Sequence, residues 1–403
     1  MSASTTPVIL AAKRTPIGRF FGGLSKVPSP FLGAYAIQAI MAENAAIGAA
    51  AKSGGVDEVI MGCVLQAGLG QAPARQAALK AGLPDTTSAV TINKVCGSGL
   101  QAVMQAGQSI KAGDNSLVMA GGFENMTRAP YFAHIRDGAG APKFGAMQFE
   151  DHMQFDGLLC PFEKWAMGNG GEHTAKKYEI SRAEQDRWAE RSNRLAAQAT
   201  KEGWYKDEIV AVTAEQTLDR KSPGVAADEG FRADTTAESL GKLRPVFDKD
   251  GTITAGNASQ ISDGGAAVCV ASLAKAEALG VKPIARIVAY HTSGVAPKEI
   301  FTAPALAVPA VIAKAGLKMS DIDLFELNEA FCAQILQNMK AGGIPEERVN
   351  IAGGATALGH PIGASGARCL TTLIHQLRRT GGKRGVVSLC LGGGNAVAMV
   401  IEV

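Results

Sequence analysis

The stretch Asn93-Lys94-Val95-Cys96-Gly97-Ser98-Gly99 determines how the rest of the chain is organised. The β-branched residues 88–92 predict a short strand before it, and apolar residues at helical spacing over 100–111 predict a helix after it. A lone cysteine therefore lies on a glycine-rich strand-to-helix turn, where the backbone turns tightly and a substrate can approach closely. The N-terminus of that helix would lower the thiol pKa and favour a nucleophilic thiolate. The alternative is a small buried residue beside a turn.

The composition is that of a soluble globular protein and excludes several classes of function. With 403 residues the chain exceeds one ordinary core, so two or three domains are expected. It is 46% hydrophobic and 19% charged. The net charge of +3, without a long basic run, is too small to imply nucleic acid, so no nucleic-acid partner is expected. No apolar stretch reaches the ~18 residues that indicate a membrane span.

The seven cysteines are odd in number and scattered, and none forms a C-x-x-C pair. This pattern predicts reduced thiols and a cytoplasmic location, with no disulfide framework and no metal site. The first residues lack the basic and apolar regions of a signal peptide. The last residues do not form a peroxisomal tripeptide.

Strands and helices alternate through the first 129 residues, which predicts an α/β fold with a parallel or mixed sheet covered on both faces. The expected strands are 7–12, 58–64, 88–92 and 116–122, the expected helices are 29–51, 76–81 and 100–111, and 14–18 is expected to be a loop.

Between about residues 130 and 250 the character of the sequence changes. Most of the tryptophan and tyrosine lies there, and strand patterns are weak. Ser181 and Glu184 have the spacing of a capping box, which predicts a helix that runs to about Lys201. We interpret this segment as an insertion that covers a site rather than as part of the sheet.

From Pro283 onward the α/β alternation returns and resembles the first half. Residues 56–62 have the pattern of 322–328, and each is followed at a similar distance by a small-residue turn, 96–99 and 360–366, that opens a helix. Two copies of one α/β unit packed on each other would explain this repeat. The predicted parts are 1–129 with 251–282, a loop domain 130–250, and 283–403.

If the two halves face each other, their matching turns converge on one place. Cys96 would then meet Asn328, His360 and Cys390 at strand ends and loop starts, where sites of α/β sheets gather. A thiol nucleophile needs a base, and histidine is its usual partner. Cys390 could act as a base on a carbon acid beside a thioester. Each of these residues also has a structural interpretation: a turn histidine, a loop amide and a buried strand cysteine.

Four segments, in order and over essentially the whole chain, resemble the signatures of the thiolase family. The resemblance implies the thiolase fold, in which two duplicated βαβαβαββ-type halves pack in five layers (αβαβα) with an inserted loop domain over the site. It also implies coenzyme A thioester substrates. The segments are Asn93-Lys94-Val95-Cys96-Gly97-Ser98-Gly99, Asn328-Glu329-Ala330-Phe331, residues 353–366 around Gly359-His360-Pro361, and Cys390-Leu391-Gly392-Gly393-Gly394.

The same resemblance implies roles for individual residues. Cys96 is the acylated nucleophile, His360 assists it, and Cys390 moves the α-proton. Asn328 with His360 and a water forms one oxyanion site, and the N–H groups of Cys96 and Gly392 form another. The residues expected to bind substrate are Leu158, Met167, Phe247, Ala255, Ala258, Ser259 and Phe331, with Arg232 and Lys221 expected at the nucleotide phosphates.

The predicted function is that of a CoA-dependent C-acyltransferase that condenses two acetyl-CoA to acetoacetyl-CoA or cleaves the product. Ala166 stands where short-chain members commonly have histidine, so a longer-chain 3-ketoacyl-CoA thiolase is an alternative. A β-ketoacyl synthase is disfavoured, because it uses cysteine with two histidines. A catalytically silent acyl-CoA or lipid binder is the alternative of another class. The expected partners are acyl-CoA and CoA, without cofactor or membrane, in a homodimer or homotetramer.

Overall fold

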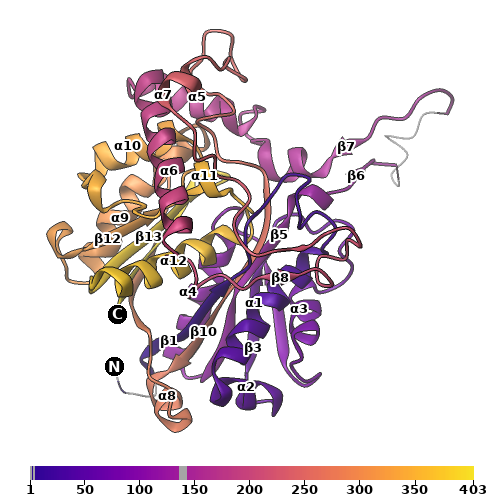
Figure 1. The fold of residues 1–403 in the computed structure, drawn as a ribbon, viewed down its shortest axis with the longest axis vertical. Helices are drawn as coiled ribbons and strands as arrows, with labels where there is room; N and C mark the ends of the chain where they lie inside the picture. Colours follow the sequence, from indigo (N-terminus) through magenta and orange to yellow (C-terminus); the bar gives the residue numbers. More distant parts are fainter. Residues whose placement is uncertain (1, 3–4, 136–142) are drawn as a thin grey trace.

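The large sheet is built from two sets of strands that meet along one edge (Figure 1). The structure is a computed structural model that describes residues 2, 5–135 and 143–403. Strands β1 and β11 pair antiparallel only at Val8 and Ile9, and this short contact joins the two sets. The first set has the order β4 (Ser88–Ile92), β3 (Glu58–Gly62), β5 (Leu117–Asn125), β10 (Ser262–Ser272), β1 (Pro7–Arg14), and the second has the order β12 (Leu324–Leu327), β13 (Arg384–Leu391), β14 (Asn395–Glu402), β11 (Ala285–Gly294).

The two sets repeat one topology, which confirms the predicted duplication. β3 pairs parallel with β5, and β12 pairs parallel with β13. In each set the next two strands then follow antiparallel, β10 and β1 in the first, β14 and β11 in the second. β4 continues the first set beyond β3, and a parallel bridge from Val349 to Phe325 occupies the matching place beside β12.

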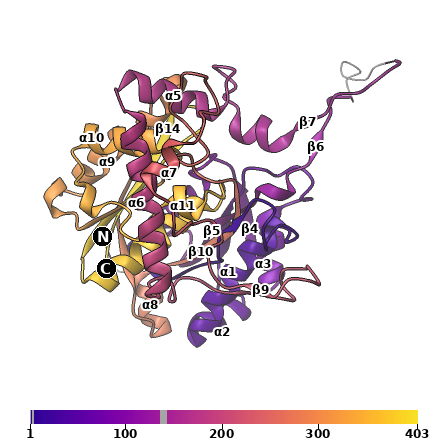
Figure 2. The same cartoon turned by 45° about the horizontal axis from the view of Figure 1, so that its top comes forward.

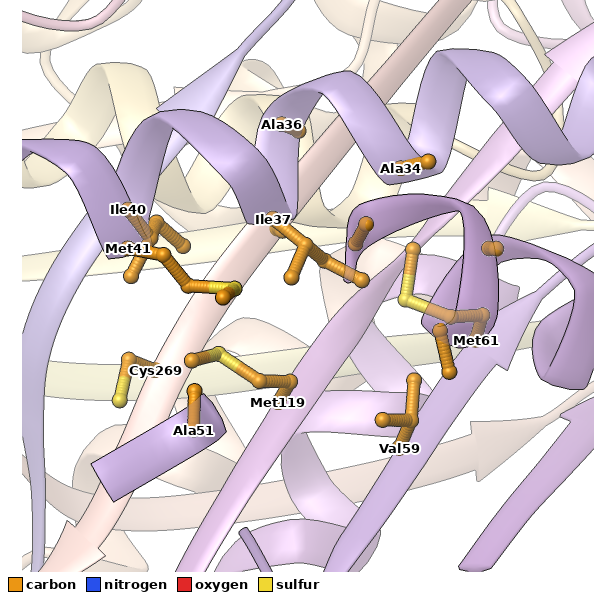
Figure 3. Close-up of a cluster of buried hydrophobic side chains, with 14 of the residues drawn as sticks. Ala34, Ala36, Ile37, Ile40, Met41, Ala51, Val59, Met61, Met119 and Cys269 are labelled. Atoms are coloured by element: carbon orange, nitrogen blue, oxygen red, sulfur yellow. The ribbon is translucent and has the colours of Figure 1, made fainter. Parts of the chain in front are cut away.

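Each of the two sets of strands forms one β layer. Helices cover the outer face of each layer and also fill the space between the layers, so the predicted αβαβα layering is confirmed. One buried cluster lies under α1, another between the two layers around α4 and α12, and a third under α9 and α10. In Figure 3, Ile37, Ile40 and Met41 of α1 face Met61 and Met119 of the first sheet. The helices are α1 (Ser29–Glu43), α2 (Ala45–Lys52), α3 (Pro73–Ala81), α4 (Ser98–Ala112), α9 (Ala303–Lys314), α10 (Cys332–Gly342) and α12 (Ser365–Thr380).

The central helices α4 and α12 meet at their first turns through glycine. A Cβ added at Gly366 would lie 2.3 Å from the backbone nitrogen of Leu100, and one added at Gly99 would lie 2.8 Å from that of Ala367. Any side chain here would separate the two helices, because real Cβ atoms do not approach backbone so closely. This contact brings the turn before α4 next to the turn before α12.

Residues 130–250 add no strand to the large sheet in the part that the structure describes. The pair β6–β7 projects from the body of the protein in both views (Figure 1, Figure 2). Helix α6 begins after Ser181 with the predicted capping box and ends at Lys201 as expected. The elements of this segment are β6 (Tyr131–Phe132), β7 (Glu150–Asp151), α5 (Met167–Lys177), α6 (Arg182–Lys201), β8 (Val212–Thr213), β9 (Gly224–Val225) and α7 (Ala237–Gly241).

A buried ion cluster ties this segment to the first sheet. The guanidinium of Arg14, at the end of β1, contacts Glu208 and Asp228, each at 2.7 Å. All three side chains are removed from water and lie in the protein interior, where an unpaired charge is costly.

The predicted domain boundaries at residues 129, 250 and 282 stay predictions.

Several predicted elements have different ends in the structure. The helix expected over 29–51 is two helices, because Asn44 is extended and its side chain accepts N–H groups from Ala46 and Ile47 to cap α2. The strand expected to reach residue 64 ends at Gly62, because the N–H of Val64 turns toward the carboxylate of Glu124. β1 extends to Arg14, and α3 begins at Pro73 rather than 76.

The remaining elements are short, and no helix of the described residues is long and apolar enough to cross a membrane. They are β2 (Gly18–Arg19), α8 (Leu273–Leu279), α11 (Ala355–Leu358), the 3-10 turns Met126–Arg128, Pro297–Thr302, Met319–Asp321 and Glu346–Arg348, and a π-helical turn, Met153–Leu158.

We predict that Gly366→Ala destabilises the protein by about 1–3 kcal/mol, because the new methyl group overpacks the helix contact. Gly241→Ala is the matched control, since a Cβ at Gly241 meets no atom within 4 Å. Chemical denaturation of both variants measures the difference. Equal stabilities would show that the α4–α12 contact is not a constraint.

Candidate active site

Three of the four predicted catalytic residues line one cavity of about 380 Å³, at the junction of the two halves and the inserted segment. Cys96 lies in the turn between β4 and α4, His360 in the turn between α11 and α12, and Cys390 near the end of β13. Asn328 is fully buried behind the cavity wall, and its Nδ2 lies 3.4 Å from Nε2 of His360. The convergence of the matching turns is therefore as predicted.

The turn that carries Cys96 is tight and held by Ser98. The backbone N–H of Lys94 donates to Oγ of Ser98 at 2.8 Å, and that hydroxyl donates to the carbonyl of Val95 at 2.6 Å. Val95 has a φ of +46°, a left-handed conformation that is rare for a β-branched residue. A Cβ at Gly97 would lie 2.3 Å from the side chain of Leu391 in the other half, so a larger residue there would displace that side chain. The turn places Cys96 on the cavity wall.

The expected lowering of the Cys96 thiol pKa is wrong. Burial raises the pKa of Cys96 to about 12, and it outweighs the backbone N–H groups of Cys96 and Gly392 that favour the thiolate. The start of α4 favours the thiolate, but the low dielectric around the turn disfavours it more strongly. Cys96 is therefore a neutral thiol near neutral pH and needs a proton acceptor to react.

His360 is built to remain neutral. Burial, together with the nearby positive charge of Arg368, lowers its pKa to about 3. Its Nδ1 lies 2.6 Å from Oγ of Ser365, and its backbone N–H donates to the carbonyl of Gln260 at 3.0 Å. A neutral imidazole that lines the same cavity as the two thiols can accept a proton.

Cys390 is a second neutral thiol on the cavity wall. Burial and the proximity of Cys96 raise the pKa of Cys390 well above the ordinary value of a thiol. It precedes a glycine turn in which Gly393 and Gly394 have φ of +84° and +86°. In this turn the backbone N–H of Gly392 faces the sulfur of Cys96, and its role as an oxyanion donor stays a prediction.

Two buried carboxylates, which the sequence analysis did not identify, hold the loops of the site. Glu124 accepts the N–H groups of Val64, Leu65 and Gly363, and so links the first half to the His360 turn. Burial raises the pKa of Glu124 to about 7. Glu329, beside Asn328, accepts from four groups of α6 and the 350–356 loop. Glu124 is the next-to-last residue of β5 and Glu329 follows Asn328, and neither position has a distinctive pattern in the sequence.

The cavity wall includes most of the predicted substrate-binding residues but not all of them. Ala255 and the side chains of Arg232 and Lys221 are exposed and lie outside the wall. The backbone of Arg232 is anchored by its N–H, which donates to Oδ1 of Asn193 at 2.8 Å, and by its carbonyl, which accepts from the N–H of Thr235 at 3.2 Å. The predicted residues that line the cavity are Leu158, Met167, Phe247, Ala258, Ser259 and Phe331.

An aromatic cluster closes the apolar end of the cavity and includes residues that were not predicted. Phe301 packs edge-on against Phe331 at 5.2 Å between ring centroids, and Phe247 lies on the other side at 6.5 Å. Helix α5 makes room for the rings, because a Cβ at Gly168 would lie 2.2 Å from Phe247. In the sequence, the glycines of α5 were the signal that could have indicated this aromatic cluster. Other unpredicted wall residues include Val95, Met126, Met153, Gln154, Ile300 and Ile362.

The arrangement supports acyl-transfer chemistry. It combines a thiol, a neutral imidazole, a second thiol and inward-facing backbone N–H groups within a largely apolar cavity. Among the described residues, no group of three or more His, Cys, Asp or Glu side chains could hold a metal ion.

Comparisons with known proteins agree along the whole chain. The family model described as the thiolase N-terminal domain matches residues 7–274, and that of the thiolase C-terminal domain matches residues 281–403. The chain is 48% identical to the acetyl-CoA acetyltransferases of Chromobacterium violaceum and of Escherichia coli, over 98% of each chain. A crystal structure of the Bacillus anthracis acetyl-CoA acetyltransferase superposes with a TM-score of 0.94 at 40% identity and covers 100% of both chains.

We predict that alkylation of Cys96 by iodoacetamide accelerates with pH through the range 7 to 10 without a plateau, because the thiolate fraction grows about tenfold per unit below the thiol pKa. Mass spectrometry of the modified peptide measures the rate. A plateau near neutral pH would instead indicate a thiolate–imidazolium pair in the free protein.

Proposed function

Because the chain belongs to the thiolase family, we propose that it is an acetyl-CoA C-acetyltransferase that condenses two acetyl-CoA to acetoacetyl-CoA and CoA, and that runs in reverse as a thiolase. The observation that carries this proposal is the meeting of Cys96, His360 and Cys390, all neutral, on one cavity wall. One thiol is needed to carry the acyl group and the other to move a carbon-bound proton.

The first half-reaction transfers the acetyl group to the protein. The sulfur of Cys96 attacks the thioester carbonyl of acetyl-CoA while its proton moves to Nε2 of His360. The thiolate of CoA leaves and takes the proton of Cys390. The products are acetyl-Cys96, an imidazolium and a Cys390 thiolate, so net charge is conserved. The two opposite charges form together, which compensates for the low dielectric that disfavours each of them alone.

The second half-reaction forms the carbon–carbon bond. The Cys390 thiolate removes an α-proton from a second acetyl-CoA, and the resulting carbanion attacks acetyl-Cys96. Acetoacetyl-CoA is released as the Cys96 sulfur leaves and takes the proton from the imidazolium of His360. All three side chains return to their neutral forms, and the order of substrates predicts ping-pong kinetics.

Preorganised donors stabilise the oxyanions of both steps in this proposal. The N–H groups of Cys96 and Gly392 face the sulfur, where the carbonyl oxygen of the acyl group would lie. His360 and Asn328, with a water, serve the enolate oxygen. Losing one such donor costs about 3 kcal/mol of transition-state stabilisation.

CoA acts as substrate and product in this scheme, and we propose no cofactor. The pantetheine arm would run along Met167, Phe247 and Ser259, which lie on the cavity wall. The contact of Arg232 and Lys221 with the nucleotide phosphates stays a prediction, and it requires that these exposed side chains lie along the path of CoA outside the cavity.

A second candidate is a 3-ketoacyl-CoA thiolase with a preference for longer chains. Ala166 lies on the cavity wall and leaves room there, and Ile300 and Phe301 make the adjoining wall apolar. Both features favour an extended acyl group. A silent acyl-CoA binder is disfavoured, because the chain retains Cys96, His360, Cys390 and Asn328.

We also propose a homodimer or homotetramer in the cytoplasm. Strand β4 is an edge of the large sheet, carries no charged residue and exposes Val90, features that leave an edge open to pairing with a second copy. The β6–β7 projection exposes Tyr131 and Phe149, which would be covered by further contacts. The seven free cysteines accord with a reducing compartment.

We predict that the purified protein cleaves acetoacetyl-CoA in the presence of CoA, seen as loss of substrate absorbance, and that Cys96→Ala abolishes the reaction. Cys269→Ala, in the buried cluster under α1 and α3, is the matched control and keeps the activity. A higher kcat/KM for a longer 3-ketoacyl-CoA would favour the second candidate. Tight acyl-CoA binding without turnover would favour the silent binder.

We predict that light scattering gives a mass of at least two chains and that Val90→Lys shifts the protein toward the monomer, because a charge on an edge strand opposes strand pairing. Val246→Lys, at a valine that is 60% exposed in the inserted segment, leaves the mass unchanged. A monomeric wild-type protein would contradict the proposed assembly.

A further inference from the structure

Ser365 is the one side chain in the described part of the molecule that contacts Nδ1 of His360, and the sequence analysis gave it no role. It is the first residue of α12 and is fully buried. Its Oγ lies 2.6 Å from Nδ1 of His360 and donates to the carbonyl of Pro361 at 2.9 Å. The single hydrogen of the hydroxyl is therefore already used, and the contact with His360 must be one in which Nδ1–H donates to Oγ.

The contact at Nε2, the other ring nitrogen, independently places the proton on Nδ1. The amide Nδ2 of Asn328 lies 3.4 Å from Nε2 and has only hydrogens to offer, so Nε2 presents its lone pair. Both ends of the imidazole thus agree on a proton at Nδ1 and none at Nε2. This is the tautomer that the first half-reaction needs, because Nε2 must accept the proton of Cys96.

We propose that Ser365 is a positioning residue that fixes His360 in the Nδ1–H tautomer through the chain Nδ1–H to Oγ–H to the Pro361 carbonyl. The proposal rests on the proposed function for its kinetic consequence, but the tautomer itself is a property of the free protein. The chain persists when Nε2 gains the proton of Cys96, because the imidazolium keeps its Nδ1–H. The same contact therefore serves both half-reactions.

The hydroxyl of Ser365 and a carboxylate at the same place would affect the charge of His360 differently. A carboxylate beside Nδ1 would stabilise the imidazolium and hold the histidine charged at rest. Ser365 orients the ring without adding charge, and Arg368 of the same helix disfavours the charged form. Cys96 and His360 consequently remain a neutral pair until substrate arrives.

The test compares Ser365→Ala with Ser365→Thr, which keeps the hydroxyl, and with Thr371→Val as the matched control. Thr371 is buried in the same helix and donates to the carbonyl of Ala367 at 2.8 Å, in the same i−4 manner as Ser365, but without a histidine partner. Steady-state thiolysis of acetoacetyl-CoA gives kcat and KM. Nitrogen-15 NMR of ¹⁵N-histidine-labelled, ligand-free protein reports which ring nitrogen of His360 carries the proton, with His360→Asn used for assignment.

We predict for Ser365→Ala a fall in kcat of about 10- to 100-fold at nearly unchanged KM, in line with loss of one buried hydrogen bond, and a gain of the Nε2–H tautomer in the NMR spectrum. Ser365→Thr restores most of kcat, and Thr371→Val retains it.

Three results would overturn the proposal: a proton on Nε2 in the wild-type protein, an unchanged kcat in Ser365→Ala, or equal losses in Ser365→Ala and Thr371→Val. If the wild-type protein does not cleave acetoacetyl-CoA, the proposed function fails, whereas the tautomer measurement still decides the role of Ser365. If Ser365→Ala does not fold, the wild-type spectrum and Ser365→Thr decide it.

Discussion

The site depends on the close contact of two helix N-termini from opposite halves. α4 and α12 can cross at their first turns only because Gly99 and Gly366 have no side chains. Gly122 and Gly363 extend this contact, since a Cβ at Gly122 would lie 2.0 Å from the carbonyl oxygen of Gly363. The turns just before both helices are thereby held in register. The turn before α4 carries the nucleophile Cys96, and the turn before α12 carries its base, His360. The close packing of the two helices therefore also brings the reacting side chains together.

Neutrality at rest is the second property that the architecture imposes. The central position that aligns the turns also removes them from water, and desolvation keeps the thiols of Cys96 and Cys390 protonated and the imidazole of His360 neutral. A permanently charged nucleophile would be costly here. Charge instead forms as a pair in the course of reaction, next to N–H groups that were in place beforehand.

Much of this could be predicted from the sequence, because the informative residues lie in long local motifs. The turns of Cys96, His360 and Cys390, the repeat of the α/β unit and the capping box of α6 all depend on neighbours along the chain. What was missed depends on distant contacts. Asn44 breaks an apolar helical pattern by capping, and Phe301 reaches the cavity from a short 3-10 turn without a motif. The thiol pKa was mispredicted because burial is a property of the folded whole.

The position of β10 in the first sheet makes folding of that sheet depend on its last strand. β10 lies between β1 and β5, paired with both, and so fills the centre of a sheet whose other strands all precede residue 126. During synthesis at ~5–20 residues per second, β1 and β5 therefore wait about 7–30 s for their central partner. Throughout that time two long apolar strands expose unpaired edges, the condition under which nascent chains aggregate or require chaperones.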